Sequence, residues 1–232
     1  MYLLTETASP FALERWAAFF ANFGQFAKGF FYTLGISLGA LIVALLLGLI
    51  FGAMSSTHNK VLRGISRVYV EIFQNTPLLV QFVVVFYGIS ILTDGHVMIP
   101  ISLTAILCVG VYTGAYISEI IRTGIEAVPK GQTEAALSQG FTYADTMRII
   151  ILPQAVRTIL PPLTNQVVNL IKNTSTVAII SGADIMFTAK AWAYDTTNYV
   201  PAFAGAAFLY FIMCFPLATW ARRKEEENKK AY

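Results

Sequence analysis

Residues 134–153 read EAALSQGFTYADTMRIIILP and separate two strongly apolar parts of the chain. The segment is too polar to cross a bilayer, because it carries several charged or amide side chains: Glu134, Gln139, Asp145 and Arg148. Ala135 and Ala136 favour a helix, which Gly140 can end by adopting a left-handed conformation. Thr142 can then cap a second short helix. The pattern predicts a helix–glycine–helix unit with a face of small residues that another protein can approach closely. The alternative is an ordinary amphipathic loop between membrane helices.

The spacing of this segment, EAA-x3-G-x9-I-x-L-P, is similar to that of the cytoplasmic loop in the membrane subunits of bacterial ABC importers. Further stretches resemble the branch of that family that imports polar amino acids: Gly29 with 33–34 (TL), 69–71 (YVE), 76–81 (TPLLVQ), 118–122 (SEIIR) and 160–175 (LPPLTNQVVNLIKNTS). Together the resemblance covers about residues 29–220.

The resemblance implies that the loop docks into a groove of a separate ATPase subunit. The residues that carry this role over are Glu134, Ala135, Ala136, Gly140, Asp145 and Arg148. It also implies that this chain binds no cofactor of its own, since ATP and Mg²⁺ belong to the partner ATPase.

Composition places the chain in a membrane. The 232 residues are 56% hydrophobic, and the mean hydropathy of +0.62 is too high for a soluble domain of this size. The formal net charge of +3 is small, so it gives no support to a role in nucleic-acid binding. Cys108 and Cys214 lie inside apolar runs without metal-ligand spacing, so we interpret both as buried thiols and expect no metal site.

Five apolar stretches are long enough to cross the hydrocarbon core, which takes a helix of about 20 residues. They cover about residues 30–54, 68–92, 99–121, 159–181 and 200–220. In the first stretch, Gly35 and Gly39, and again Gly48 and Gly52, have the spacing that lets a neighbouring helix approach closely. We therefore predict an all-α integral membrane protein with five transmembrane helices. The resemblance implies the core of a type I ABC importer permease.

The same pattern divides the chain into regions. Residues 1–28 form an aromatic, amphipathic segment that lies in the membrane interface or packs outside the helix bundle. Residues 29–221 form the transmembrane permease domain, with a coupling loop at 122–158 between the third and fourth spans. Residues 222–232 form a charged tail.

The lysines and arginines are unevenly divided between the two sides of the membrane. One side carries Lys60, Arg63, Arg67, Arg122, Lys130, Arg148, Arg157 and the basic tail, and the other carries Arg15, Lys28 and Lys190. The positive-inside rule then places the N-terminus outside and the C-terminus in the cytoplasm. The resemblance makes the membrane the cytoplasmic membrane of a bacterium, and the coupling loop faces the side where ATP is found.

No group of residues in the sequence predicts catalysis. The two histidines, His58 and His96, fall on opposite sides of the membrane in this topology and cannot converge on one site. The chain also lacks a glycine-rich phosphate loop followed by Lys-Ser or Lys-Thr. We therefore expect a subunit that is not an enzyme, with ATP hydrolysis supplied by a partner.

Polar side chains inside the spans are the candidates for a solute pathway, because they are costly in a bilayer. Asn165, Asn169 and Asn173 recur every four residues and share one helical face, as interhelical contacts or as a pathway lining. Lys172 either lines the pathway too or pairs with a carboxylate, Glu71 or Glu119. Glu119 can also pair with Arg122, three residues on. Glu71 and Gln74 open the second span and are further candidates, although the family usually has arginine at the position of Gln74.

The resemblance implies an ATP-driven importer of a polar amino acid, glutamate or glutamine first, with a basic amino acid or cystine as the alternative. Its implied partners are a pair of ATPases, a second permease that is a copy or a sister subunit, an extracytoplasmic binding protein and membrane lipid. Two other classes compete. One is a non-transporting assembly or signalling subunit. The other is a secondary transporter with Glu71 or Glu119 as a proton site, which the absence of an inverted repeat in the hydropathy disfavours.

Overall fold

The computed structural model describes residue 9 and residues 11–230, without the side chains of 224, 225 and 227–230. Every regular element in this part of the chain is helical. In chain order the elements are α1 (Leu13–Ala21), α2 (Phe23–Ser55), α3 (Lys60–Gln74), α4 (Leu78–Val83), η1 (Val84–Gly88), α5 (Ile89–Leu92), α6 (Ile101–Glu126), α7 (Lys130–Ser138), α8 (Tyr143–Asp145), η2 (Thr146–Ile151), α9 (Leu152–Asn173), η3 (Thr174–Ile180), α10 (Ile185–Thr196) and α11 (Tyr199–Lys230).

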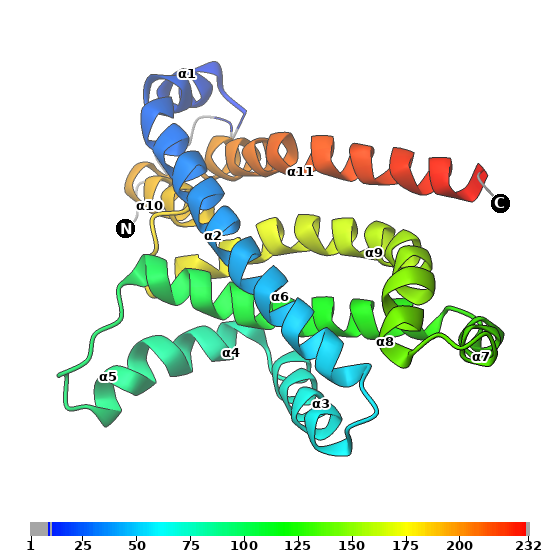
Figure 1. Ribbon diagram of the computed structural model, residues 1–232. Helices are drawn as coiled ribbons and strands as arrows, with labels where there is room; N and C mark the ends of the chain where they lie inside the picture. Colours follow the sequence, from blue (N-terminus) through cyan, green and yellow to red (C-terminus); the bar gives the residue numbers. More distant parts are fainter. Residues whose placement is uncertain (1–8, 10, 231–232) are drawn as a thin grey trace.

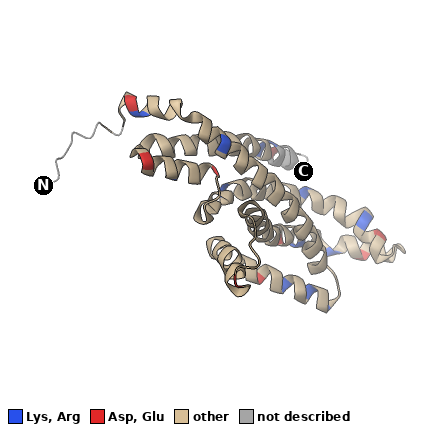
Figure 2. Ribbon diagram, turned by 90° about the vertical axis from the view of Figure 1, so that its left-hand side faces the viewer, with Lys and Arg blue, Asp and Glu red and all other residues tan. Residues whose placement is uncertain are grey.

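Helices α6, α9 and α11 run side by side, and α2 crosses α6 diagonally and also contacts α9 (Figure 1). Helices α1 and α10 lie at one end of this bundle, and α7 and α8 lie at the other. Most of the ribbon carries no charge, and the charged residues gather toward the outer parts of the helices (Figure 2). An all-helical arrangement is what a membrane demands, because a helix satisfies its own backbone hydrogen bonds.

Three helices of the described part are long and apolar enough to cross a membrane: α2, α6 and residues Tyr199–Arg223 of α11. A bent pair, α3 with the run from α4 to α5, counts as a fourth if the two are one span. Helix α9 is not apolar enough to count among them, because asparagines, Arg157 and Lys172 interrupt its apolar residues. It also changes into the 3₁₀ helix η3 after Asn173, inside the predicted fourth span. Five crossings therefore remain a prediction.

The second predicted span, 68–92, is not one straight helix. Helix α3 ends at Gln74, and the helical run that starts at Leu78 is bent from it by 97°. Pro77 causes the break, since it has no N–H to donate and its ring excludes helical geometry from the residue before it. Gln81 satisfies two of the carbonyls freed there, and its side-chain amide donates to Phe73 O at 3.2 Å and to Thr76 O at 3.1 Å.

Helices α2 and α6 form the most extensive helix pair of the molecule, and glycines bring them together. A Cβ at Gly48 would lie 2.4 Å from Ile117 Cγ2, and one at Gly52 would lie 2.8 Å from Ile121 Cβ. Gly39 faces α6 in the same way. The predicted close approach is thus confirmed for these three glycines. It is wrong for Gly35, around which a Cβ would meet nothing within 4 Å.

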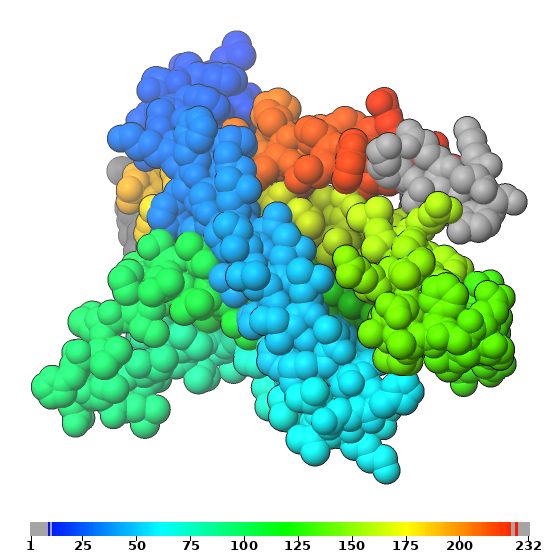
Figure 3. All heavy atoms as spheres, in the orientation of Figure 1, coloured from blue at the N-terminus to red at the C-terminus, as the bar shows by residue number. Residues whose placement is uncertain are grey.

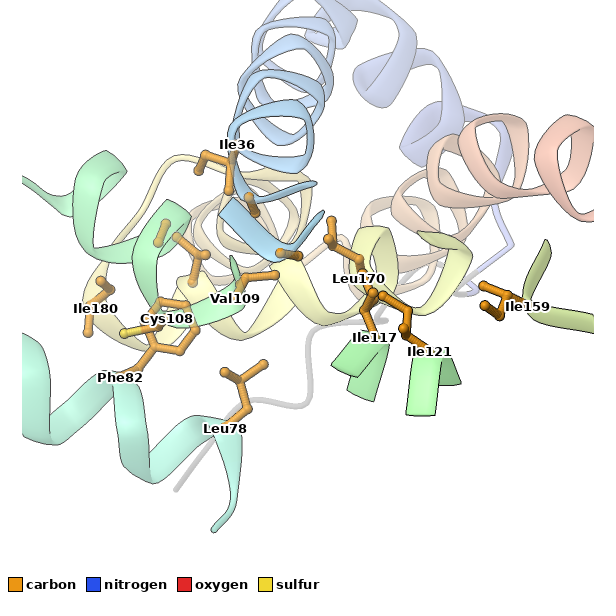
Figure 4. Close-up of a cluster of buried hydrophobic side chains, with 14 of the residues drawn as sticks. Ile36, Leu78, Phe82, Cys108, Val109, Ile117, Ile121, Ile159, Leu170 and Ile180 are labelled. Carbon is orange, nitrogen blue, oxygen red and sulfur yellow. The ribbon is translucent and has the colours of Figure 1, made fainter. Parts of the chain in front are cut away.

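The core lies between α2, α4, α6, α9 and η3. Figure 4 shows Phe82, Val109, Leu170 and Ile180 converging there, and all four are almost fully buried. A second apolar cluster joins α1 and α2 to α10 and α11, where Phe19 and Phe26 pack against Trp192. The N-terminal helix is therefore attached to the bundle by aromatic contacts, while other apolar side chains of α1, such as Leu13 at 86% exposure, remain uncovered.

Candidate functional site

The segment between α6 and α9 has the predicted helix–glycine–helix form. Helix α7 ends at Ser138, and Gly140 follows with a left-handed φ of +85°. The backbone N–H of Phe141 then donates to Ala136 O at 3.1 Å, which closes the helix end. Thr142 Oγ1 accepts a hydrogen bond from Asp145 N at 3.2 Å and so caps the next helix, as predicted.

Most of the predicted docking residues lie on the outside of this segment. Those with exposed side chains or an exposed backbone are Glu134, Ala135, Gly140, Asp145 and Arg148. Ala136 differs, because it is only 3% exposed and faces into its own chain. Ala136 therefore supports the segment from within. The segment also touches the α2–α3 link, where the ring of Tyr143 meets His58 edge-on, with ring centroids 4.9 Å apart.

A cavity of about 870 Å³ lies between the α2–α3 link, α3 and the last turns of α6. It brings together Glu71 and Gln74 from α3 with Glu119 and Arg122 from α6. The Gln74 side-chain amide donates to Ala115 O at 3.2 Å, which fixes it against α6.

The carboxylates of this cavity have partners of their own. Arg122 Nε donates to Glu119 Oε2 at 2.9 Å, which confirms the expected pair, and the same guanidinium also reaches Glu126 at 2.5 Å. Glu71 accepts a hydrogen bond from the Asn75 amide at 2.9 Å. The sequence prediction missed the cations that share this cavity: Lys60, Arg63 and Arg67. Their spacing of three to four residues was the available signal, since it places them on one helical face.

The asparagine face of α9 is separate from that cavity. Asn165 and Asn169 are exposed and Asn173 is half-buried, and none of the three lines the cavity beside α3. The structure therefore does not bring Glu71 and Gln74 together with the asparagines. The asparagines share one polar face of α9, and this face is largely uncovered. The opposite side of α9 packs inside the bundle.

Lys172 faces a second, smaller hollow of about 310 Å³ between α9, α10 and α11. The hollow is mainly apolar, and Ser175 and Tyr210 are its other polar side chains. No carboxylate of the described residues lies within 4.0 Å of the Lys172 ammonium. The alternative in which Lys172 pairs with Glu71 or Glu119 is therefore absent from this structure.

A buried carboxylate lies behind Tyr210. Asp184 is fully buried and caps α10, accepting hydrogen bonds from Phe187 N at 2.8 Å and Met186 N at 3.2 Å. The Tyr210 hydroxyl donates to the same carboxylate at 3.0 Å. Burial raises the pKa of Asp184 to about 6, against the opposing effect of these hydrogen bonds. The cluster joins α10 to α11 beside the hollow that Lys172 lines.

Comparison with known proteins assigns the family. Residues 44–225 match the family described as "Binding-protein-dependent transport system inner membrane component". The chain is 37% identical over 216 residues to the "Probable glutamine ABC transporter permease protein GlnM" of Bacillus subtilis, covering 92% of this chain and 97% of that one. It is 33% identical over 208 residues to the "Glutamate/aspartate import permease protein GltJ" of Escherichia coli K12, covering 82% and 85%.

A solved structure agrees with these sequence relatives. It is described as "Crystal structure of an amino acid ABC transporter with histidines", and it superposes with a TM-score of 0.84 at 31% identity. The match covers 91% of this chain and 98% of the other. The fold is therefore that of type I ABC importer permeases, and the family's subunits carry out translocation without being enzymes. The chain belongs to the binding-protein-dependent transport system inner membrane components and is the permease subunit of an ABC transporter.

Proposed function

We propose that this chain lines the translocation pathway of an ATP-driven importer of a polar amino acid, with glutamine or glutamate as the first candidate substrate. The observation that carries the proposal is the uncovered polar face of α9, where Asn165 and Asn169 are exposed. Uncovered amides are unfavourable against hydrocarbon, so this face needs water, solute or a second permease beside it. Two permeases with their polar faces toward one another would enclose such a pathway.

The substrate class is supported by relatives rather than by a bound solute. The printed names of two relatives concern glutamine and glutamate or aspartate. The solved structure was described with histidines, so a basic amino acid is the second candidate. The amides of Asn165 and Asn169 suit either, because each can donate to a carboxylate and accept from an ammonium group.

The function is tested by reconstituting this permease with its ATPase, its sister permease where there is one, and its binding protein in liposomes. We expect ATP-dependent uptake of labelled glutamine or glutamate, with unlabelled competitors ranking the other amino acids. ATP hydrolysis that no amino acid stimulates, with no uptake, would identify a non-transporting subunit instead. Uptake driven by an ion gradient without ATP would identify a secondary transporter.

We infer that coupling to the ATPase runs through the exposed residues of 134–148. Replacing Gly140 by leucine adds no clash, because a Cβ there meets nothing within 4 Å. The residue must nevertheless hold φ near +85°, which costs an ordinary residue about 1–2 kcal/mol. We expect Gly140→Leu to insert normally while co-purification of the ATPase and transport both fall. Gly140→Asn is the matched control, since asparagine tolerates this conformation and should retain more coupling.

A wild-type transport rate with Gly140→Leu and an intact ATPase complex would contradict this role of the glycine. Glu134→Gln should have a much smaller effect than Gly140→Leu. The reason is that an exposed ion pair contributes only about 0–1 kcal/mol.

We propose the orientation in which α7 and α8 face the cytoplasm and the α5–α6 connection faces outward. A cysteine replacing Thr93, which follows α5, should then react with an impermeant thiol reagent added to intact cells. A cysteine replacing His58, which contacts Tyr143 of the coupling loop, should react only after the cells are opened. The reverse pattern of labelling would overturn the orientation and the docking role of residues 134–148.

A further inference from the structure

Helix α3 presents three different faces, and one of them fixes it to the bundle. Ser66 is fully buried, and its hydroxyl donates to Phe51 O of α2 at 2.7 Å. Tyr69 is 9% exposed, and its hydroxyl donates to Val111 O of α6 at 2.7 Å. The ring of Tyr69 also stacks on Phe51 with centroids 4.0 Å apart. Because this face is tightly held, the other two faces of α3 have defined directions.

The second face of α3 is a charged stripe that lines the 870 Å³ cavity, and it consists of Lys60, Arg63, Gly64, Arg67 and Glu71. The third face is an apolar stripe, in which each residue directly follows a residue of the charged stripe in the sequence. Val61 is 69% exposed, Ile65 50%, Val68 59% and Ile72 52%. Successive residues are about 100° apart around a helix, so the two stripes are adjacent. In Figure 3, α3 projects at the lower edge of the molecule, and its uncovered surface is visible there.

Two cations that line the cavity have no carboxylate partner among the described residues. Arg122 is engaged by both Glu119 and Glu126, and Arg67 lies 4.0 Å from Glu71. Lys60 and Arg63 have no carboxylate within 4.0 Å among the described residues. These two cations lie beside the α2–α3 link and are available to hold an anion.

The cavity lies at the ends of two apolar helices, which is the depth of lipid headgroups. The lining includes Ser55 at the end of α2 and Glu126 at the end of α6, where both apolar helices stop. Helices of this kind end near the boundary between hydrocarbon and headgroups. In the proposed orientation this is the cytoplasmic leaflet, which holds anionic lipids that basic pockets between membrane helices attract.

We propose that the cavity beside α3 binds an anionic phospholipid of the cytoplasmic leaflet. Lys60 and Arg63 hold the phosphate, and the acyl chains lie along the apolar stripe of Val61, Ile65, Val68 and Ile72. A soluble anion would use the cations but leave the apolar stripe uncovered, whereas a phospholipid satisfies both adjacent faces at once. The location of the site rests on the proposed orientation, but lipid binding itself does not require that the complex transports.

The test is native mass spectrometry of the assembled transporter, purified in mild detergent and titrated with phosphatidylglycerol or phosphatidylcholine. We expect the wild-type complex to retain phosphatidylglycerol in preference to phosphatidylcholine. The Lys60→Gln/Arg63→Gln variant should lose that preference and bind phosphatidylglycerol about tenfold or more weakly. The charge-matched control is Arg222→Gln/Arg223→Gln, which removes two exposed arginines of α11. It should bind phosphatidylglycerol as the wild type does.

A second variant tests the space rather than the charge. Gly64 lines the cavity, and a Cβ added to it meets nothing within 4 Å, so Gly64→Phe should fill the cavity without disturbing the fold. We expect this variant to exclude the lipid while its melting temperature stays near that of wild type. Gly24→Phe, on α2 and also in open space, is the matched control.

Equal retention of phosphatidylglycerol by wild type, Lys60→Gln/Arg63→Gln and Gly64→Phe would overturn the proposal. A change in the number of permease subunits in these variants, with lipid retention unchanged, would overturn it too and identify α3 as a subunit interface. Both outcomes are read without a transport assay. They are therefore distinguishable from a failure of the proposed transport function.

Discussion

Replacing Gly48 by leucine is expected to prevent most of the protein from folding in the membrane. Gly48 lies where α2 crosses α6, and a Cβ on it would come within 2.4 Å of Ile117 Cγ2 and 2.6 Å of Ile117 Cβ. Ile117 is 1% exposed and belongs to the core that Figure 4 shows, so it has little freedom to move away. Overpacking of a core costs about 1–3 kcal/mol or more. A leucine adds three further carbons to this Cβ, so we expect the helix pair to separate.

The measurement is the amount of monodisperse protein on size-exclusion chromatography and its melting temperature in detergent. Gly35→Leu is the matched control, since it makes the same change on the same helix at a position with open space around it. We expect Gly35→Leu to behave as wild type. Adding Ile117→Ala to Gly48→Leu should restore part of the loss, because the second change removes Ile117 Cγ2, the nearest atom of the clash, and leaves only the Cβ. Equal melting temperatures for Gly48→Leu and Gly35→Leu would contradict the α2–α6 packing described here.

These two glycines show how far sequence alone could reach. Gly35, Gly39, Gly48 and Gly52 have the same four-residue spacing, which correctly predicts close helix contact but cannot say over which length of α2 it occurs. Because α2 crosses the bundle diagonally, only part of its glycine face meets α6. Crossing geometry depends on the partner helix, and that information is not local.

The structure of the coupling loop near Gly140 could be predicted, because it depends only on residues that are neighbours in the sequence. The left-handed Gly140 and the Thr142 cap each follow from the chemistry of a few neighbouring residues. The break at Pro77 was not predicted as a bend, because hydropathy averaged over 68–92 passes smoothly across it. The burial of Ala136 could not be predicted from the sequence either, since a run of two alanines does not show which one faces inward.

The candidate pathway residues lie at two separate places in the fold, and the sequence could not show this because it does not reveal contacts between distant helices. Helical periodicity correctly groups the asparagines of α9, but only the fold shows that Glu71 and Gln74 line a different cavity, beside α6. It also shows that Glu119 and Glu71 already have partners three or four residues further along the chain, Arg122 and Asn75. The sequence could propose an ion pair between Lys172 and either carboxylate. The distances between separate helices exclude that pair in this structure.

Lys172→Met is expected to give an assembled complex that hydrolyses ATP but imports little amino acid. Lys172 is exposed and lines the hollow between α9, α10 and α11, and its ammonium has no carboxylate within 4.0 Å among the described residues, so its removal breaks no ion pair there. In the predicted fourth span a lysine would cost about 2.5–3.5 kcal/mol, and a role in attracting the substrate carboxylate would explain that cost. A hydrogen bond to a charged group contributes about 1.5–3 kcal/mol, so we expect uptake to fall about tenfold or more at low substrate concentration.

Lys172→Arg keeps the charge and should retain more uptake. Lys190→Met is the matched control, because it removes an exposed lysine from α10 and should leave uptake unchanged. Wild-type uptake by Lys172→Met would rule out a substrate role for this lysine, and a lowered melting temperature would show that its role is structural.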